Sequence, residues 1–400
     1  MNIRKDFPFF KNNNETYLDS AASSLKPKCV SDAISKYYLK YGSNIDRGIY
    51  QSAIEATIIY EESRNRVAKF INASPKEVIF TKGATNSLNM IALSYGMDNV
   101  EENDEIIISE AEHHSHILPW QRVAKLKKAK LIYVPLNKDG SFSIEKYKKC
   151  LSNKTKVVAL AQISNVLGYE IDIKEVIRLA HEVGAVVSVD ACQSAPHIKI
   201  DVKDLDCDFL SFSFHKMCGP TGVGILYGKE ELLNKMEPVE LGGDMNDEVY
   251  KYKVTYKELP HKFEAGTQNI AGVFGVKETL DYLESINYLE LDQKIRKLTK
   301  YTINKLKKID GLTIYTKASK ATSIIAFNIE NVHAHDAVTF FAASNIDIRA
   351  GHHCAELMHN FLNVSATLRA SFYLYSNKKD ADIFIKTVQE AVNFFKELGF

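Results

Sequence analysis

Lys216 has the sequence setting in this 400-residue chain that most suggests chemistry. It follows the β-rich run 209–213 and precedes the turn sequence Gly-Pro-Thr-Gly at 219–222. Its amine would therefore lie on a rigid turn at the end of a strand. A lysine whose pKa is lowered by its site can form an imine with an aldehyde cofactor. The same pattern is also common for a plain surface lysine, so Lys216 alone does not establish a site.

Two other loops that follow apolar runs carry residues that fit the same cofactor. Asp190 ends the run 185–190, and a carboxylate there can keep a pyridinium nitrogen protonated. A metal ligand or a helix cap would look the same. The loop 82–86 has small residues and a hydroxyl before a helical pattern, which is typical of a phosphate cup or of an ordinary helix cap.

The loop 112–116 contains three histidines, His113, His114 and His116. One interpretation is a zinc site, but the spacing does not match HExxH and no cysteine pair lies nearby. An imidazole stacked on a flat cofactor ring fits the neighbouring loops better. We therefore predict a cofactor site without a bound metal, and zinc binding remains an alternative.

A second group of reactive residues lies near the C-terminus. Cys354 follows two histidines and Gly351, with Arg349 close by, and such neighbours can make a thiol partly ionised at neutral pH. A buried, inert thiol is the other interpretation. Arg369 lies in an apolar run; a buried arginine needs a carboxylate partner, which an amino-acid substrate offers in bidentate geometry.

The elements that must position these residues alternate between strand and helix. Helical patterns lie between the earlier β-rich runs, at 87–95, 117–128, 144–151 and 173–183. The alternation predicts a mostly parallel sheet, whose ligands bind at the carboxyl ends of the strands. Only a short loop separates the last two runs, so an antiparallel edge or exception is expected there. The β-rich runs are 78–81, 105–109, 130–134, 156–161, 185–190, 209–213 and 223–227.

The pattern changes after residue 266, which indicates a second, smaller α+β domain. A long helical segment at 269–308 comes first. We predict an α/β fold with helices on both faces of the central sheet, a large cofactor-binding domain over 21–285, and a small domain from 1–20 with 286–400. Short strands then follow at 312–315, 322–329 and 346–349, and helices at 335–345 and 380–398.

Composition narrows the class of function. A net charge of +1 gives no electrostatic argument for binding nucleic acid or an anionic membrane. No apolar stretch reaches the ~20 residues of a membrane span, and no secretory signal is recognisable at the start. Six cysteines without CxxC spacing predict free thiols in a reducing compartment, and we expect a cytoplasmic protein.

Ordered motifs along nearly the whole chain make it resemble a known family. They are YLDSAASS, NIDRGIY, GATNSLN, EHHSHILPWQ, SNVLG, VDACQSAPH, SFSFHKMCGPTGVGILYG, FEAGTQN, RAGHHCA and RASFYLY. The chain resembles the cysteine desulfurases of the SufS type, within the class V aminotransferase family of fold-type I pyridoxal-phosphate enzymes. It is most similar to the Gram-positive, SufU-dependent form.

This resemblance implies a homodimeric enzyme that converts L-cysteine to L-alanine with pyridoxal 5'-phosphate as cofactor. Lys216 would hold the cofactor as a Schiff base and move protons, His113 would stack on its ring, and Cys354 would receive the sulfur as a persulfide. Asn165, Arg349 and Arg369 would bind the substrate. The implied cofactor-binding residues are Ala84, Thr85, His113, Asp190, Gln193, Ser213, His215, Lys216 and, from the other subunit, Thr267.

The resemblance also implies a sulfur acceptor, a SufU-type zinc scaffold serving iron–sulfur cluster assembly, with His335 as the candidate ligand to the partner's zinc. Three sites depart from the family pattern: Asp46, Cys218 and the hook at 241–247. A selenocysteine lyase needs the same residues and stays an alternative. A sulfur-relay partner that has lost catalysis is another, which the joint presence of Lys216 and Cys354 argues against.

Overall fold

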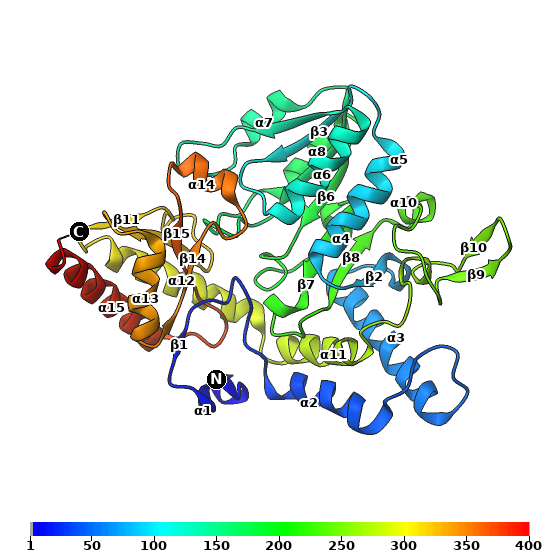
Figure 1. Ribbon diagram of the computed structural model, residues 1–400, viewed down its shortest axis with the longest axis horizontal. Helices are drawn as coiled ribbons and strands as arrows, with labels where there is room; N and C mark the ends of the chain where they lie inside the picture. The colour runs from blue at the N-terminus through cyan, green and yellow to red at the C-terminus, as the bar shows by residue number, and fades with distance from the viewer. Residues whose placement is uncertain (1–2, 400) are drawn as a thin grey trace.

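A computed structural model describes residues 3–399, and its larger sheet has seven strands in the order β2-β8-β7-β6-β5-β3-β4 (Figure 1). All its pairs are parallel except those of β8, which runs antiparallel to β2 and β7. The strands are β2 (Val78–Thr81), β3 (Glu105–Ser109), β4 (Lys130–Val134), β5 (Thr155–Ala161), β6 (Val186–Asp190), β7 (Phe209–Ser213) and β8 (Gly224–Gly228).

All seven β-rich runs are strands, and the predicted α/β fold with a mostly parallel sheet is confirmed. The antiparallel exception is β8, but it lies inside the sheet and not at its edge. A short loop suffices for this connection because antiparallel neighbours need no helical crossover.

Both faces of the larger sheet are covered by apolar clusters. Neighbouring residues of a strand point to opposite sides of the sheet, and they belong to different clusters. Ile106 and Phe209 pack in a cluster with Trp120 of α6, whereas Ile107 and Leu210 belong to the larger core on the other face. This two-sided burial explains why the strands read as continuous apolar runs.

Helices supply the cover on the two faces. Helices α4 and α6 pack together on one side, and α2, α3 and α11 pack together on the other. The helices of this part are α2 (Lys28–Lys36), α3 (Gln51–Ile71), α4 (Ala84–Ile91), α5 (Met97–Asn99), α6 (His114–Lys127), α7 (Ile144–Cys150), α8 (Ile173–Glu182), α9 (Val202–Leu205), α10 (Glu230–Lys235) and α11 (Ile270–Ser285).

The C-terminal part is built on an antiparallel sheet in the order β11-β12-β15-β14. This part of the chain lies at the left of Figure 1, and it has its own apolar cluster. Its strands are β11 (Leu312–Ile314), β12 (Ile324–Ile329), β14 (Arg349–Gly351) and β15 (Thr367–Ser371). Its helices are α12 (Tyr288–Leu306), α13 (Ala334–Ala343), α14 (Glu356–Leu362) and α15 (Lys378–Glu397).

Two predicted elements are divided in the structure. The helical segment 269–308 is two helices, α11 and α12, because Asn287 adopts a left-handed conformation with φ of 50° between them. The predicted strand 346–349 also splits: β13 (Ile346–Asp347) pairs with β1 (Thr16–Tyr17), whereas β14 pairs with β15. The N-terminal segment is thereby joined to the C-terminal part.

The domain boundaries at 21 and 285 stay a prediction; the break between α11 and α12 lies beside the second. The β9–β10 hairpin, with β9 (Asn246–Val249) and β10 (Val254–Tyr256), projects from the body at the right of Figure 1. No helix within residues 3–399 is long and apolar enough to cross a membrane. The shorter helical turns are Ile3–Asp6, Phe9–Asn12, Tyr37–Tyr41, Pro75–Glu77, Ala92–Gly96, Phe214–Lys216 and His261–Phe263.

Candidate active site

A cavity of about 240 Å³ opens where the parallel strands of the larger sheet end, between this sheet and the C-terminal part. This is the usual ligand position in open α/β sheets. Residues from both parts of the chain form its walls. The sequence-predicted residues that line it are Ala84, Thr85, His113, Asn165, Asp190, Gln193, Ser213, His215, Lys216, Arg349, Cys354 and Arg369.

Lys216 and Asp190 enter this cavity from neighbouring strands of the sheet. Lys216 ends the short helical turn directly after β7 and is half-buried, so it is not the plain surface lysine of the alternative interpretation. Asp190 is the last residue of β6, is only 6% exposed, and accepts a hydrogen bond from the backbone N–H of Cys192 at 2.8 Å. The cavity therefore holds an amine and a buried carboxylate.

The start of α4 forms a second wall. The backbone N–H of Ala84 donates to Ser213 Oγ at 2.8 Å, and the hydroxyls of Thr85 and Ser115 lie 2.7 Å apart. Gly83 has a φ of 147°, and a Cβ on Gly224 would lie 2.5 Å from the Gly83 Cα. The two glycines thus let β2, β8 and the helix start approach closely. Backbone N–H groups at a helix start can bind a phosphate.

His113 is the N-cap of α6, where its Nδ1 accepts from the backbone N–H of Ser115 at 3.1 Å. Burial lowers the pKa of His113 to about 4, and the nearby Lys216 amine adds to this effect. The ring is therefore neutral at pH 7. A neutral, partly buried imidazole is suited to stacking on a flat ligand.

The three histidines of this loop do not converge on one point. His114 Nε2 accepts from the backbone N–H of Glu356 at 3.0 Å, and His116 Nδ1 lies 3.1 Å from the buried carboxylate of Glu112. Across residues 3–399, no group of three or more histidine, cysteine, aspartate or glutamate side chains is arranged to hold a metal. The geometry gives the zinc alternative no support.

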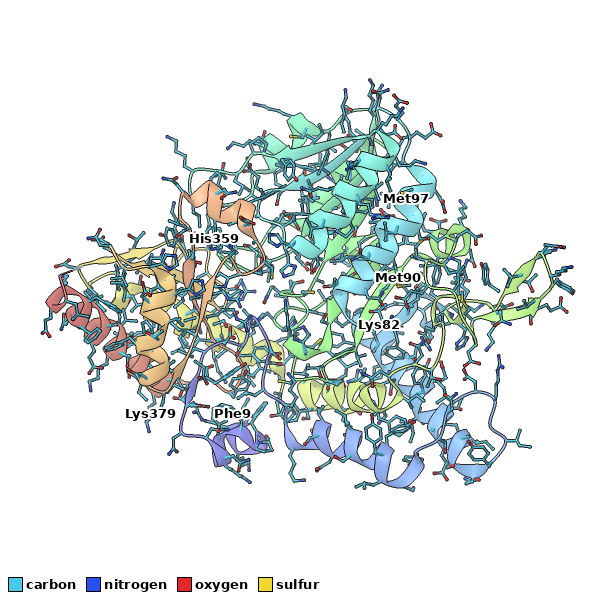
Figure 2. The ribbon with its side chains drawn as sticks, viewed as in Figure 1. Phe9, Lys82, Met90, Met97, His359 and Lys379 are labelled. Atoms are coloured by element: carbon cyan, nitrogen blue, oxygen red, sulfur yellow. The ribbon has the colours of Figure 1, made fainter. Side chains whose placement is uncertain are left out.

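Cys354 lies in the loop between β14 and α14 and is exposed, which contradicts the interpretation as a buried thiol. His353 and Cys354 have φ values of 50° and 55°, and Gly351 has 126°. Positive φ is uncommon for residues other than glycine, and such conformations cluster at functional sites. The loop contacts β15 through His353, whose Nε2 lies 3.1 Å from the backbone oxygen of Thr367. The buried His359 of α14, labelled in Figure 2, also approaches Thr367, with its Nε2 3.0 Å from Thr367 Oγ1.

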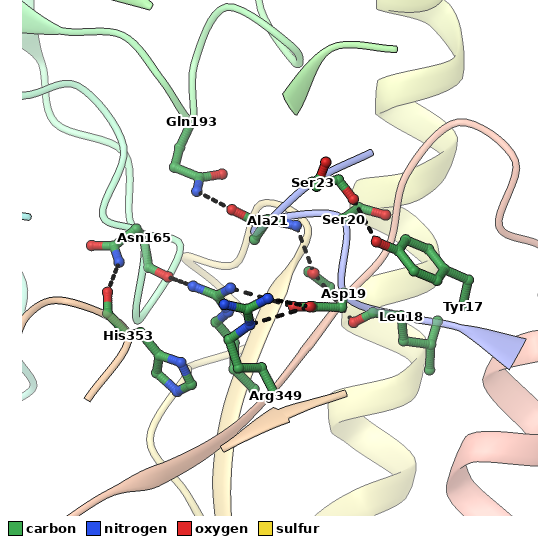
Figure 3. A network of polar contacts seen from close by, with 12 residues as sticks. Tyr17, Leu18, Asp19, Ser20, Ala21, Ser23, Asn165, Gln193, Arg349 and His353 are labelled. Atoms are coloured by element: carbon green, nitrogen blue, oxygen red, sulfur yellow. Dashed lines mark hydrogen bonds and ion pairs between the residues drawn. The ribbon is translucent and has the colours of Figure 1, made fainter. Parts of the chain in front are cut away.

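The substrate-binding candidates Arg369 and Asn165 contact each other. Arg369, on β15, is buried and donates from Nη1 to the backbone oxygen of Asn165 at 2.9 Å. The Asn165 side chain donates to the backbone oxygen of His353 at 2.7 Å (Figure 3). This chain of contacts links β15, the loop after β5 and the Cys354 loop around one side of the cavity.

Two residues predicted from the resemblance do not line this cavity. Thr267 is exposed and lines a different pocket, near Asn269 and Glu240. His335 is exposed on α13 with its ring stacked on His333, and it lies next to the Cys354 loop, since a Cβ on Gly351 would be 3.9 Å from its ring.

Some residues at the site were not expected from the sequence. The lining residues Ala21, Ser115, Cys192 and His353 are among them. Asp19 is another: it pairs with Arg349 and Arg369, two residues of the cavity wall. The signal for Asp19 was available, since it lies in the YLDSAASS motif and a buried arginine needs a carboxylate. The sequence around Ala21 and His353 gives no comparable indication of a role.

The three departures from the family pattern lie outside the cavity. Cys218 is buried with a φ of 66°, and its N–H donates to Ser24 Oγ at 2.6 Å. Asp46 also has a positive φ, and the adjacent Arg47 forms an ion pair of 2.9 Å with Asp244 of the 241–247 hook. The segment that contains Asp46 therefore contacts the 241–247 hook through this ion pair.

The family model described as aminotransferase class-V matches residues 16–384. The chain is 49% identical over 380 residues to a probable cysteine desulfurase of Halalkalibacterium halodurans, covering 95% of this chain and 93% of that protein. It is 46% identical to a probable cysteine desulfurase of Staphylococcus epidermidis, covering 98% and 97%.

Solved structures agree with this match. The crystal structure of the Escherichia coli cysteine desulfurase CsdA has a TM-score of 0.92 at 38% identity, covering 98% of both chains. The apo cysteine desulfurase of Thermococcus onnurineus has a TM-score of 0.94 at 37% identity, covering 98% of this chain and 97% of that one. The fold, the cavity and the extent of these matches together establish that the chain belongs to the aminotransferase class-V family, among proteins named cysteine desulfurases.

Proposed function

We propose that this chain is a cysteine desulfurase that converts L-cysteine to L-alanine and keeps the sulfur on Cys354 as a persulfide. The observation that carries the proposal is that Lys216, Cys354 and Arg369 line one cavity. An amine, a thiol and a guanidinium are the groups needed to bind a carbonyl cofactor, to accept sulfur and to bind an amino-acid carboxylate.

The donor set of the cavity fits pyridoxal 5'-phosphate. Lys216 would hold its aldehyde carbon, Asp190 its ring nitrogen, and the start of α4 at Ala84 and Thr85 its phosphate. His113 is held neutral and half-buried, as a stacking ring requires. When bound, the cofactor supplies an electron sink for negative charge that develops at the substrate Cα. Ser213, His215 and Gln193 would complete the cofactor site, with Thr267 contributed to the second copy of a homodimer.

The other steps belong to the protein's own side chains. Arg369, with Asn165 and Arg349, would hold the substrate carboxylate and so orient Cα toward Lys216. The Lys216 amine would take the proton from Cα and return it to the product. This places the proton transfers on one residue at the end of β7.

The sulfur transfer would occur at Cys354. Its thiolate attacks the sulfur of L-cysteine, so that a sulfur–sulfur bond forms as the bond from that sulfur to Cβ breaks. The electron pair left on the three-carbon fragment takes up a proton, which gives L-alanine. In balance, L-cysteine and the enzyme thiol become L-alanine and the enzyme persulfide.

The exposure of Cys354 supports delivery of the persulfide to another protein. The acceptor proposed here is a SufU-type zinc scaffold for iron–sulfur cluster assembly in the cytoplasm. His335 supports this acceptor as a candidate ligand to the partner's zinc, because it is exposed and close to the Cys354 loop.

The test is release of alanine and sulfide from L-cysteine by the purified protein, with and without the candidate scaffold. Cys354→Ala should lose desulfuration and keep the yellow cofactor, whereas Cys207→Ala, at a buried cysteine, should keep both. Alanine formation at the wild-type rate by Cys354→Ala would refute the proposed role. Parallel rates on L-selenocysteine distinguish a selenocysteine lyase.

A further inference from the structure

Asp19 lies between the two arginines of the candidate substrate site. Its Oδ2 accepts from Arg349 Nη2 at 2.9 Å and from Arg349 Nε at 3.2 Å, and its Oδ1 is 3.5 Å from Arg369 Nη2. Figure 3 shows Asp19 facing Arg349 at the centre of this polar network. One carboxylate therefore contacts guanidinium groups from two strands, β14 and β15.

The backbone around Asp19 is fixed to the strand that carries Arg369. Asp19 forms an isolated parallel bridge with Ser371 of β15. Ser371 also donates from its N–H to Leu18 O at 2.6 Å and accepts at Oγ from the Ala21 N–H at 2.8 Å. The position of the Asp19 carboxylate is thus determined by backbone contacts on both sides of it.

The ion pairs of the two arginines leave a place for one further anion. Among residues 3–399, Asp19 is the carboxylate that forms an ion pair with Arg349 and with Arg369, so one carboxylate is shared by two guanidinium groups. The buried atoms Arg369 Nε and Asp19 Oδ1 both lack a hydrogen-bond partner within residues 3–399. The nearby His353 adds no charge, because burial and Arg369 lower its pKa to about 2.

We propose that Asp19 is a positioning residue that orients Arg369 and Arg349 toward the carboxylate of the amino-acid substrate. It neutralises one of the two guanidinium charges and holds Arg349, which is half exposed to solvent, against the cavity. The remaining positive charge then binds the substrate carboxylate. The inference rests on the proposed desulfurase function for the identity of that substrate.

Steady-state kinetics on L-cysteine test this role with the variants Asp19→Asn and Asp19→Ala. We expect Asp19→Ala to raise KM roughly tenfold or more while kcat changes little, because carboxylate binding is lost in the ground state and transition state alike. Asp19→Asn keeps the shape of the side chain and one acceptor oxygen, so its KM should lie between that of the wild type and that of Asp19→Ala. The control is Asp32→Asn, since Asp32 is an exposed carboxylate of α2 that pairs with Lys28.

Binding of the product separates this inference from the proposed reaction. Calorimetric titration of the holoenzyme with L-alanine should show roughly tenfold weaker binding in Asp19→Ala, while L-alaninamide, which lacks the carboxylate, should bind both proteins equally. An unchanged KM and an unchanged L-alanine affinity in a folded Asp19→Ala would overturn the role of Asp19. If Asp19→Ala does not fold, Asp19→Asn is the deciding variant. An unchanged KM and an unchanged L-alanine affinity in Asp19→Asn would then overturn the role of Asp19. Failure of the wild-type protein to form alanine would refute the desulfurase proposal alone, because the L-alanine titration still reports on Asp19.

Discussion

His114 holds the loop of Cys354 through two hydrogen bonds. Its backbone N–H donates to the carbonyl oxygen of Cys354 at 2.7 Å, and its ring Nε2 accepts from the backbone N–H of Glu356 at 3.0 Å. The first residue of α6 is thereby attached to both sides of the loop end. Because His353 and Cys354 have positive φ values, these contacts stabilise a conformation that the local chain disfavours.

Replacing the His114 ring should loosen the loop without removing the thiol. In His114→Ala the backbone bond to Cys354 remains, but the N–H of Glu356 loses its acceptor. One such bond contributes about 1 kcal/mol, so we expect a three- to tenfold lower rate of alanine formation. Hydrogen exchange of residues 352–356 should also become faster. The control is Gln121→Ala on the exposed side of α6, which should exchange like the wild type. Equal exchange rates in the wild type and His114→Ala would contradict the role of the His114 ring in holding the loop.

Cys354 should be the first cysteine to react with iodoacetamide in the native protein. It is the exposed one among the six cysteines, all of which lie within residues 3–399. Burial raises the pKa of the thiols of Cys29, Cys150, Cys192, Cys207 and Cys218. The thiolate is the reactive form, so these groups should react slowly. Peptide mass spectrometry at pH 7.5 checks the order, and Cys354→Ala should remove the rapid phase; rapid labelling of any other cysteine would contradict it.

Lys216→Ala should lose the visible absorbance of the lysine-bound cofactor near neutral pH. The reason is that Lys216 is the amine that lines the cavity together with Asp190. The mutant protein should bind added pyridoxal 5'-phosphate only weakly and reversibly. Lys174→Ala, at an exposed lysine of α8, is the control and should keep the wild-type spectrum. An unaltered spectrum in Lys216→Ala would place the cofactor elsewhere.

Much of the fold could be predicted because both faces of the larger sheet are buried, which makes its strands readable as apolar runs. The break at Asn287 could not, since asparagine adopts the left-handed conformation only occasionally and its presence in a helical pattern does not by itself mark the end of a helix. The interior position of β8 could not be predicted either, because the order of the strands along the chain does not fix their order across the sheet.

The candidate site was predictable where a residue type has a specific chemical use. Lys216, Asp190 and Cys354 could be recognised in this way, and the structure brings them to one cavity. The need of a buried arginine for a carboxylate could be predicted, but its identity as Asp19 could not, because the contacts of Asp19 with Arg349 and Arg369 span more than 300 residues of sequence. Thr267 remains a prediction, since its proposed role needs a second copy of the chain.

The protein should lose stability as the pH falls from 7 to 5. Burial, with Lys216 nearby, lowers the pKa of His113 and of His215 to about 4 each. An unfolded chain binds protons on these rings near pH 6.5. Between pH 6.5 and 4 the unfolded state therefore binds more protons, so the free energy of unfolding falls as the pH decreases through this window.

Urea unfolding at pH 7 and pH 5 measures this effect. Each of the two histidines should account for about 2 kcal/mol of the loss at pH 5. In His215→Gln the difference between the two pH values should shrink by that amount, whereas His335→Gln, at an exposed position, should retain the full difference. An equal loss in His215→Gln and the wild type would contradict the assignment.

The ion pair of Arg64 and Glu264 should be the most sensitive polar contact in the large core. The side chains are 1% and 4% exposed, and Glu264 accepts from Arg64 Nη1 at 2.6 Å and Nη2 at 2.9 Å. Glu264 also accepts from the Phe80 N–H at 2.7 Å and the Tyr60 hydroxyl at 3.2 Å. The carboxylate thus joins α3, β2 and the loop that carries Thr267.

Arg64→Met leaves the Glu264 carboxylate buried without a cation, so this variant should lower the free energy of unfolding by about 3–5 kcal/mol. Glu264→Leu should lower it by less, because Arg64 keeps its ion pair of 2.9 Å with the half-buried Glu61. The double variant should lose less than the sum of the two single variants, because neither buried charge then remains. Urea denaturation of the four proteins measures this coupling. Arg178→Met, which breaks two exposed ion pairs on α8, is the control and should have a far smaller effect. Additive losses would mean that the two side chains act independently, and the pair would then not be what holds α3 to β2.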